Sequence, residues 1–222
     1  MILEGKILKN KILDNLSYEI SKLKIKPTLV VIQVGNNSAS NIYVSQKKNM
    51  ADYVGINFIH EKLEETILEE ELIKIIDNYN NDDNVDGIIV QLPLPKHIDE
   101  QLIINSISSK KDVDGFGIEN KGKLFSGLEC FKSATPYGII KLLEAYDINV
   151  SGMNAVVVGR SNIVGKPMSI MLLDKNATVT ICHSRTKDLK SVTNKADLLV
   201  VAIGKSKFIK EDMVKENAIV ID

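Results

Sequence analysis

The sequence predicts an α/β protein of two α/β domains with a cleft between them, the second a Rossmann-like domain with a parallel sheet. Apolar runs rich in β-branched residues alternate with stretches whose apolar residues recur at helical spacing, a pattern typical of parallel sheets covered by helices. A glycine-rich turn follows one of the later runs. The length of 222 residues suffices for two domains of roughly 100 residues each.

Two runs in the first half are expected to form buried strands. They are TLVVIQVG, which ends at Gly35, and VDGIIVQL, which ends at Leu92. Between them, NIYVSQKKNMADYVG from Asn41 and EEELIKIIDNYN from Glu69 have helical spacing. The stretch 93–135 has no long apolar run and is rich in Gly, Lys and Asp, so we expect it to join the two domains.

The second half repeats the alternation. Helices are expected in TPYGIIKLLEAY and GKPMSIMLLDK, and strands in NAVVVG, ATVTICH, ADLLVVAIG and AIVID. We therefore place the first domain at residues 1–134 and the second at 135–222. The last run ends at Asp222, where an open sheet would normally present groups to its ligand and continue, so we expect this chain to be truncated.

Composition gives no support to several classes of protein. The 28 basic and 29 acidic residues are well mixed and leave a net charge of -1, which indicates no binding of nucleic acid or anionic membrane. No secretion signal is visible, and the longest apolar run is far shorter than the roughly 20 residues of a membrane-spanning helix. Cys130 and Cys182 form no CxxC pair and no cluster with histidine, so we expect reduced thiols, no metal site and a cytoplasmic protein.

The turn GRSNIVGKP follows a strand and opens a helix, which is the context of a phosphate-binding loop. Free backbone N–H groups and the positive end of the helix dipole favour a phosphate there. Gly159 permits the sharp turn, and Gly165 permits close packing of the helix. However, Ser161 stands where the GxGxxG pattern has its second glycine, and the third glycine comes one residue late. Taken alone, the turn is equally consistent with a purely structural role.

The end of the next strand distinguishes between the nicotinamide dinucleotides. NAD sites usually carry Asp or Glu about 20 residues after the loop, whereas arginine suits the 2′-phosphate of NADP. Here His183, Ser184 and Arg185 end the strand without a carboxylate, and Arg160 lies in the loop. This pattern favours NADP. The alternative is that both arginines are solvated surface charges and that His183 bonds to the backbone.

Tyr43 and Lys47 lie four residues apart on an expected helix, so both can address one ligand. The helix follows a strand, and its start faces the carboxyl edge of the sheet, where ligands bind. Spacing alone favours an ordinary amphipathic helix, in which the lysine stem extends over the tyrosine ring. Short-chain dehydrogenases contain the same spacing, but their dinucleotide loop precedes the pair, whereas here the pair comes first.

Gln91 and Asp114 are further candidates for ligand binding. VQLPLP places Gln91 at the end of a strand, and KKDVDGF places Asp112 and Asp114 in a turn before Gly115. An amide and a carboxylate at these places can bond to a heterocycle with adjacent donors and acceptors. The alternatives are an amide that anchors a loop and an aspartate that stabilises its own turn.

Together and in this order, these segments resemble the bifunctional methylenetetrahydrofolate dehydrogenase/cyclohydrolase family. The matching pieces are VGNNSASNIYVSQKK, DGIIVQLPLP, KDVDGF, TPYG, GRSNIVGKP, ATVTICHSRT and ADLLVVAIG, which span nearly the whole chain. The resemblance implies an enzyme of one-carbon metabolism that oxidises 5,10-methylenetetrahydrofolate with NADP and hydrolyses the methenyl product to 10-formyltetrahydrofolate. It also implies a homodimer.

The resemblance also implies roles for individual residues. Lys47 matches the catalytic lysine, Tyr43 the tyrosine that packs on the folate, and Gln91 the glutamine that contacts the lysine. Asp114 matches the aspartate that holds the pterin, and Ser40 a serine that lines the site. The expected folate-binding set is Ser40, Tyr43, Gln91, Leu92, Pro93 and Asp114. The expected cofactor-binding set, which joins the resemblance to the loop argument, is Gly159, Arg160, Ser161, Gly165, His183, Ser184 and Arg185.

Three features depart from the family pattern. Asn49 stands where a second lysine often follows the catalytic one, and Ser133 with Ala134 replaces the usual Pro-Cys. A Gly-Gly-Val-Gly segment of the family does not occur before the sequence ends at Asp222. These departures leave two alternatives open: a non-catalytic module that binds NADP or folate, and a dehydrogenase without cyclohydrolase activity.

Overall fold

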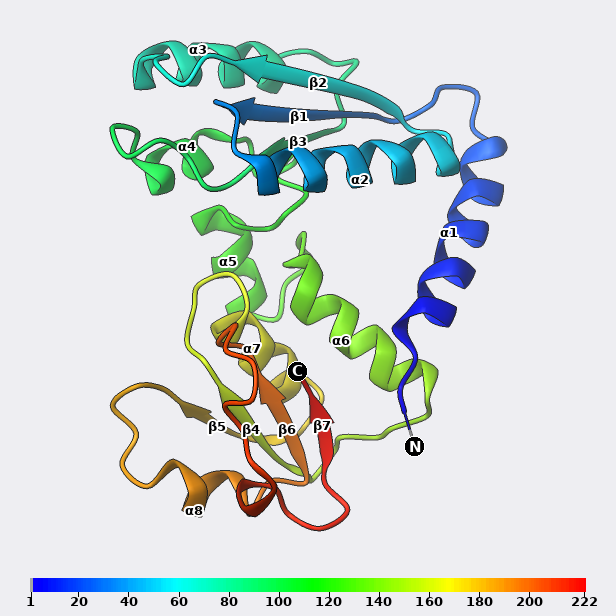
Figure 1. Ribbon diagram of the computed structural model, residues 1–222. Coiled ribbons are helices and arrows are strands. Elements are labelled where there is room, and N and C mark those ends of the chain that lie inside the picture. The colour runs from blue at the N-terminus through cyan, green and yellow to red at the C-terminus, as the bar shows by residue number, and fades with distance from the viewer. Residues whose placement is uncertain (1) are drawn as a thin grey trace. The chain divides into compact units, whose positions relative to one another are not determined.

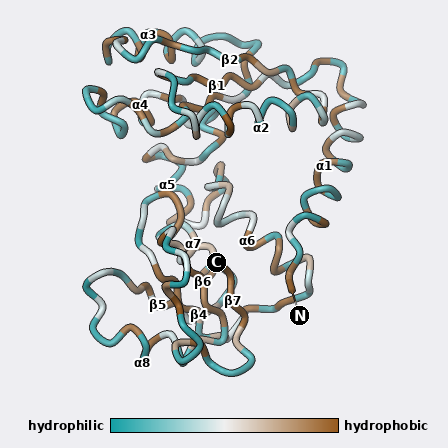
Figure 2. Tube along the Cα trace, viewed as in Figure 1, coloured by the Kyte–Doolittle hydropathy of each residue, from teal (hydrophilic) through white to brown (hydrophobic). Residues whose placement is uncertain are grey.

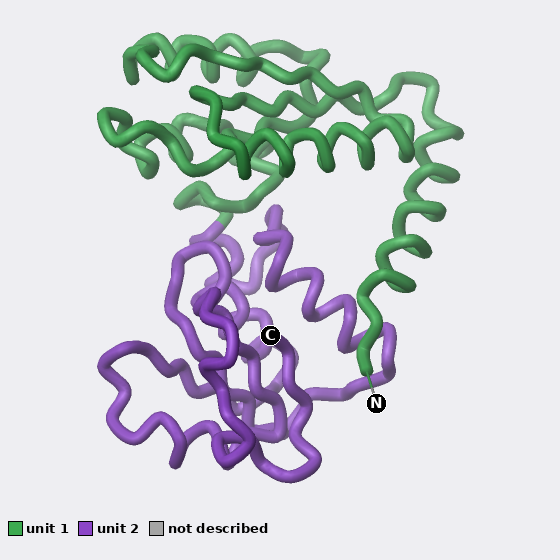
Figure 3. Tube along the Cα trace, in the orientation of Figure 1, with its two compact units in different colours: residues 1–120 green, residues 121–222 purple. Residues whose placement is uncertain are grey.

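The structure is a computed structural model that describes residues 2–222, and the chain divides into two compact units. The first unit ends at Asn120 and the second begins at Lys121 (Figure 3). Each unit is built on its own parallel sheet (Figure 1), so the predicted α/β class is confirmed. Across residues 2–222, none of the helices is both long and apolar enough to span a membrane.

The first unit alternates strands with helices and orders its strands β2-β1-β3. In chain order its elements are α1 (Gly5–Ser21), β1 (Thr28–Val34), α2 (Ser38–Val54), β2 (Asn57–Leu63), α3 (Glu69–Asn80), β3 (Gly87–Val90), α4 (Glu100–Ser106) and α5 (Ile118–Phe125), the last of which crosses the division between units. The strands expected to end near Gly35 and Leu92 are β1 and β3. The helices expected from Asn41 and Glu69 are α2 and α3, so these predictions are confirmed.

The alternation of side chains along β1 divides the core of the first unit into two layers. Val30 and Ile32 pack with Leu72 and other side chains of α3 and α4 on one face. Val31 packs with Val44 of α2 on the opposite face. Helices α2 and α3 therefore cover opposite faces of the sheet (Figure 1), and this double cover explains why residues 29–32 of β1 are all apolar.

Three parts of the first unit differ from the sequence prediction, and the first is α1, a helix that is not predicted from the sequence. The pattern does not predict β2, because this edge strand pairs with β1 alone and its apolar run is interrupted by His60, Glu61 and Lys62. The stretch 93–135 does more than join two domains. It contributes α4 to the first unit, where Ile103 is fully buried in the core beneath α3.

The second unit repeats the architecture with the strand order β5-β4-β6-β7. Its elements are α6 (Ala134–Ala145), β4 (Asn154–Val158), α7 (Gly165–Asp174), β5 (Thr178–Cys182), α8 (Leu189–Thr193), β6 (Leu198–Val201), the 3-10 helix η1 (Glu211–Met213) and β7 (Ile219–Ile221). All strand pairs are parallel. The four strands and two helices that the sequence predicts in this half are confirmed.

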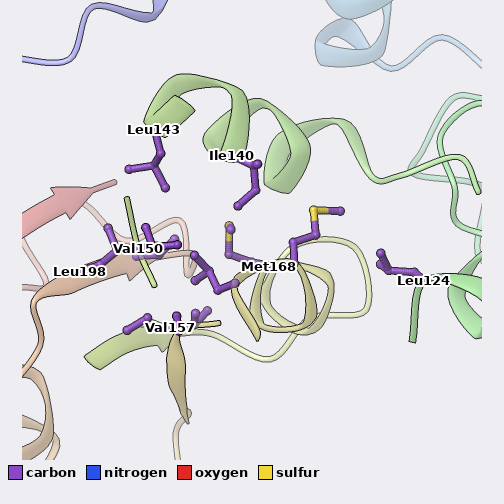
Figure 4. Close-up of a cluster of buried hydrophobic side chains, with 12 residues drawn as sticks. Leu124, Ile140, Leu143, Val150, Val157, Met168 and Leu198 are labelled. Carbon is purple, nitrogen blue, oxygen red and sulfur yellow. The ribbon is translucent and has the colours of Figure 1, made fainter. Parts of the chain in front are cut away.

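The core of the second unit also has two layers. Figure 4 shows Ile140 and Leu143 of α6 on one side of the cluster, facing Met168 of α7 and the sheet residues Val157 and Leu198. The other face of the sheet packs against α8 and the segments on either side of η1. Hydrophobic residues concentrate along the strands, whereas hydrophobic and hydrophilic residues alternate along the helices (Figure 2). Both sheets are thus buried on two faces, as parallel sheets are.

The division by packing falls at Asn120, before the domain boundary expected at residue 134. Leu124 and Cys130 pack on the apolar cluster of the second unit, so the chain that leads into α6 belongs to that unit. Because this stretch is rich in Gly and Lys, its composition does not indicate these two contacts.

Candidate functional site

Both sheets reverse their strand order at one point. The chain places β2 and β3 on opposite sides of β1, and it places β5 and β6 on opposite sides of β4. Ligands of open α/β sheets bind beyond the carboxyl ends of the strands at such a reversal. In the first unit this point carries the start of α2 and the residues after β3. In the second unit it carries the turn after β4.

Lys47 and Gln91 come from different elements and meet directly. The side chain of Asn37 caps α2 by accepting a hydrogen bond from Ser40 N at 3.0 Å, which fixes the first turn of the helix. About two turns farther on, Lys47 Nζ donates to Gln91 Oε1 at 2.7 Å. Gln91 Nε2 donates to the carbonyl of Leu92 at 2.8 Å, so the amide is held with its oxygen toward the lysine.

The residues around this pair differ in exposure. Ser40 is 3% exposed, and its hydroxyl donates to the Leu92 carbonyl at 3.5 Å. The peptide bond between Leu92 and Pro93 is cis. Tyr43 lies one turn before Lys47, is 59% exposed, and has no hydrogen-bond partner among residues 2–222. Its ring is therefore available to a ligand.

Lys47 and Asp114 are half-buried and influence each other's protonation. Burial lowers the pKa of Lys47, and the carboxylate of Asp114 opposes that shift. Burial raises the pKa of Asp114; Lys47 opposes this shift, and the neighbouring carboxylate of Asp112 reinforces it. Burial outweighs the mutual attraction in both cases, so the neutral form of each group is more accessible than it is in water.

Two glycines of the turn after β4 are required by space. Gly159 has a φ of 132°, and a Cβ there would lie 2.5 Å from the carbonyl oxygen of Ala202. A Cβ on Gly165 would lie 2.3 Å from the carbonyl oxygen of Gly159. Any side chain at either position would push the turn away from α7 or from β6, so the close approach depends on glycine.

Ser161 caps α7 and changes where the free donors lie. Its hydroxyl accepts hydrogen bonds from the backbone N–H groups of Val164 at 3.1 Å and Gly165 at 3.2 Å. Among the residues that the structure describes, the backbone N–H groups of residues 160–163 have no partner. The free donors therefore precede the start of α7. They lie one turn earlier in the chain than the sequence motif suggests. The Ser161 hydroxyl keeps its own proton and can also donate to an anion.

The residues after β5 form a closed turn. His183 N donates to Thr186 Oγ1 at 2.8 Å, and Arg185 N donates to His183 Nδ1 at 3.1 Å. The second bond needs a lone pair on Nδ1, so a neutral ring carries its proton on Nε2. His183 thus bonds to the backbone, while Ser184, Arg185 and Arg160 are exposed.

The remaining reactive groups are potential metal ligands and the two thiols. In the part of the chain that the structure describes, no group of three or more His, Cys, Asp or Glu side chains could hold a metal ion. Cys130 and Cys182 are free thiols, and burial raises the pKa of each. A raised pKa disfavours the nucleophilic thiolate.

A buried polar network beside the start of α2 is not predicted from the sequence. Gln33 of β1 is 1% exposed, and its Nε2 donates to Asn41 Oδ1 at 2.7 Å. His60 Nε2 contacts Gln33 Oε1 at 3.1 Å. Because Asn41 lies in the first turn of α2, the network ties that turn to the sheet. The signal in the sequence is Gln33, an amide within the otherwise apolar stretch LVVIQV.

Comparison with known proteins identifies one family for both units. The sequence model of the tetrahydrofolate dehydrogenase/cyclohydrolase catalytic domain matches residues 3–114, and that of the NAD(P)-binding domain of the same family matches residues 133–222. A relative named bifunctional protein FolD, from Agathobacter rectalis, is 51% identical over 224 residues, which cover 100% of this chain and 80% of the relative.

Solved structures give the same result. The bifunctional enzyme FolD, a methylenetetrahydrofolate dehydrogenase/cyclohydrolase from Campylobacter jejuni, has a TM-score of 0.98 at 48% identity and covers 99% of this chain and 79% of its own. The Trypanosoma brucei N5,N10-methylenetetrahydrofolate dehydrogenase-cyclohydrolase, solved with NADP cofactor and inhibitor, has a TM-score of 0.94 at 28% identity, over 99% of this chain and 77% of its own. Both likenesses extend through the two units.

Proposed function

The chain belongs to the tetrahydrofolate dehydrogenase/cyclohydrolase family, as its ordered motifs indicate, and we propose that it catalyses both reactions of that name. It oxidises 5,10-methylenetetrahydrofolate with NADP, and it hydrolyses the resulting 5,10-methenyltetrahydrofolate to 10-formyltetrahydrofolate. One observation carries the proposal. Lys47, an amine whose pKa is lowered by burial, donates to Gln91 Oε1 at 2.7 Å at the carboxyl edge of the first sheet.

The hydrolytic step needs a base, and Lys47 supplies it. The oxygen of a water molecule adds to the cationic methenyl carbon and loses a proton to the neutral amine of Lys47. The hydroxyl on that carbon then loses its proton to solvent and becomes the formyl C=O as the bond to N5 breaks, and N5 takes up the proton that Lys47 accepted. The lowered pKa of Lys47 increases the fraction of amine that is neutral. Gln91 holds Nζ in place during these transfers.

The folate is held by polar and aromatic groups of the first unit. The carboxylate of Asp114 receives no hydrogen bond from residues 2–222, so its oxygens are available to the N–H groups of the pterin. The exposed ring of Tyr43 packs on the folate. Ser40, with Leu92 and Pro93, lines the space beside Lys47. Because hydride transfer requires no protein nucleophile, this positioning is the contribution of the first unit to the dehydrogenase step.

The second unit fits a dinucleotide phosphate. The N–H groups of residues 160–163 are free, and the glycines at 159 and 165 place no side chain where the turn approaches β6 and α7. Arg160, Ser184 and Arg185 are exposed and suit a 2′-phosphate, and no carboxylate ends β5 to favour NAD. His183 supports the turn after β5 by accepting the Arg185 N–H. When bound, NADP supplies the acceptor for the hydride.

The dehydrogenase is tested by mixing the purified chain with 5,10-methylenetetrahydrofolate and NADP. We expect NADPH to form, as followed by its absorbance, and we expect a lower kcat/KM with NAD. A rate no higher than that of a protein-free blank would refute the dehydrogenase assignment.

The cyclohydrolase is tested separately by supplying 5,10-methenyltetrahydrofolate without NADP and following the loss of its absorbance. Oxidation without hydrolysis would identify a dehydrogenase that lacks the second activity. Calorimetric binding of NADP or tetrahydrofolate without either reaction would identify a non-catalytic binding module.

We also propose that the protein acts in the cytoplasm as a homodimer and binds neither nucleic acid nor membrane. The family resemblance supports the dimer, and the even mixture of charges supports the absence of polyanionic partners. Analytical ultracentrifugation tests the dimer, because a sedimentation coefficient of a 24.6 kDa species at micromolar concentration would contradict it.

A further inference from the structure

One buried carboxylate of the first unit has no role in the mechanism above. Asp112 is 1% exposed and stands two residues before Asp114 in the turn KDVDG. A charge buried to this degree is stable only when its oxygens receive hydrogen bonds. The donors that Asp112 has recruited therefore indicate what it holds.

The donors come from the chain just beyond Asp114. Asp112 Oδ1 accepts from Phe116 N at 3.2 Å, and Oδ2 accepts from Gly117 N at 2.8 Å and from Asn120 Nδ2 at 2.9 Å. Gly117 permits this approach, because a Cβ there would lie 3.0 Å from Oδ2. The side chain of Asp112 thus closes the turn that carries Asp114.

The near end of the turn is fixed to the sheet. Ile88 of β3 donates its backbone N–H to the carbonyl of Lys111 at 2.8 Å and pairs with Asp112 in a parallel bridge. Asn120, which is 2% exposed, also donates to the carbonyl of Ser109 at 3.0 Å. The backbone is therefore held both before and after Asp114, on the same edge as Gln91.

Asp114 has no support of its own, because no residue in the range 2–222 donates to its carboxylate. Its direction depends on the backbone of the turn. We propose that Asp112 is a positioning residue, which together with Asn120 holds this turn so that Asp114 meets the pterin of the folate. The inference rests on the proposed function, since it gives Asp112 a task in catalysis only if Asp114 binds the folate.

The substitution Asp112→Asn keeps the shape of the side chain but turns an N–H₂ group toward backbone donors. We expect the KM for 5,10-methylenetetrahydrofolate to rise about tenfold, in line with the loss of a hydrogen bond to a charged group. We expect a smaller fall in kcat and an unchanged KM for NADP. Asp86→Asn is the matched control. Its carboxylate accepts a backbone N–H from Thr28 at 2.8 Å in the same unit, outside this turn, and both KM values should stay unchanged.

The pH dependence gives a readout that a purely structural role would not alter. The charged groups that act on Asp114 are Lys47 of α2, which lowers its pKa, and Asp112, which raises it. Removing the Asp112 charge should therefore move the acid limb of tetrahydrofolate binding to lower pH. A mere loss of packing would weaken binding and leave that limb where it is.

A second variant keeps the inference testable if Asp112→Asn does not fold, as judged by circular dichroism. Asn120→Ala removes one donor from the same carboxylate and should raise the KM for the folate by about threefold or more. In the background of Asp114→Asn, the same substitution should add no further rise, because both act through one group. Equal rises in both backgrounds would overturn the inference.

Calorimetric binding of tetrahydrofolate separates this inference from the proposed function. A wild-type chain that neither turns over nor binds tetrahydrofolate would refute both. A wild-type chain that binds it, together with Asp112→Asn and Asn120→Ala variants that bind as well as Asp86→Asn, would overturn the positioning role alone.

Discussion

The two units share a sheet topology at their candidate sites, but they build those sites from different parts of the chain. In the first unit, the order β2-β1-β3 brings the side chain of Lys47 to that of Gln91. In the second, the matching order β5-β4-β6 presents free backbone N–H groups in a turn made close by Gly159 and Gly165. Topology therefore fixes where a site lies, and the chemistry of the ligand decides whether side chains or main chain must face it.

The difference follows from what each half must do. The proton transfer that we propose for the first unit needs a group that changes its charge, and burial lowers the pKa of Lys47 to make this easier. Phosphate binding needs donors and space, which the main chain provides without burying a charge. Accordingly, the charged candidates of the second unit, Arg160 and Arg185, are exposed.

The largest effect is expected for Lys47→Met, which removes the amine from the site built of side chains. We expect cyclohydrolase activity to fall by about 10²- to 10⁴-fold, the range that a positioned acid or base contributes, while tetrahydrofolate still binds. Lys48→Met, at the exposed next position of α2, is the control and should retain both activities. Unchanged hydrolysis by the Lys47 variant would exclude this lysine as the base.

The next test concerns the turn built from the main chain. Gly165→Ala would place a methyl group 2.3 Å from the carbonyl of Gly159. Such overpacking typically costs about 1–3 kcal/mol, and we expect the KM for NADP to rise about tenfold or more while tetrahydrofolate binding is retained. Gly138→Ala is the control, because nothing lies within 4 Å of its Cβ in α6. It should leave NADP binding unchanged and raise stability by up to about 1 kcal/mol. Equal effects of the two substitutions on the KM for NADP would contradict the spatial argument.

Most of the fold is predictable from local pattern. Elements such as β2 and α4 are missed because no local pattern shows how they are packed. Strands buried on both faces, such as β1 and β4, consist mostly of apolar residues and are recognised as strands. The edge strand β2 is missed because most of its residues are exposed and it contains no continuous apolar run. The short helix α4 is missed because its burial depends on α3, which lies far from it in sequence.

The two candidate sites differ in the same way. The turn after β4 is contiguous, so Gly159, Ser161 and Gly165 form a motif that the sequence displays. The bond between Lys47 and Gln91 joins residues 44 positions apart, and helix spacing alone does not predict it. The donors of Asp112 depend on the path of the chain in three dimensions. A site made of side chains from several elements is thus less visible in a sequence than one made of a single turn.

The third prediction asks whether the exposed arginines recognise the 2′-phosphate. Arg185→Gln and Arg160→Gln should each raise the KM for NADP about tenfold, since each removes a charge-assisted hydrogen bond to a phosphate. Neither should change the KM for NAD by a comparable factor. The ratio of kcat/KM for NADP to that for NAD measures the effect. A parallel loss with both dinucleotides would show that these side chains serve the turn and not the 2′-phosphate.

The smallest expected effect is on the stability of the folded state, which the burial of Lys47 lowers. Burial lowers the folded-state pKa of Lys47 below its ordinary value of 10.5, so between that lowered pKa and pH 10.5 the unfolded chain binds more protons than the folded one. Within this window the stability of the wild type must rise with pH relative to that of Lys47→Met. Thermal unfolding of both proteins over a pH series measures the trend as a change in the difference between their Tm values. A difference that stays constant would mean that the amine of Lys47 is fully solvated in solution. The contrast between a site of buried side chains and a site of exposed main chain would then not hold for Lys47.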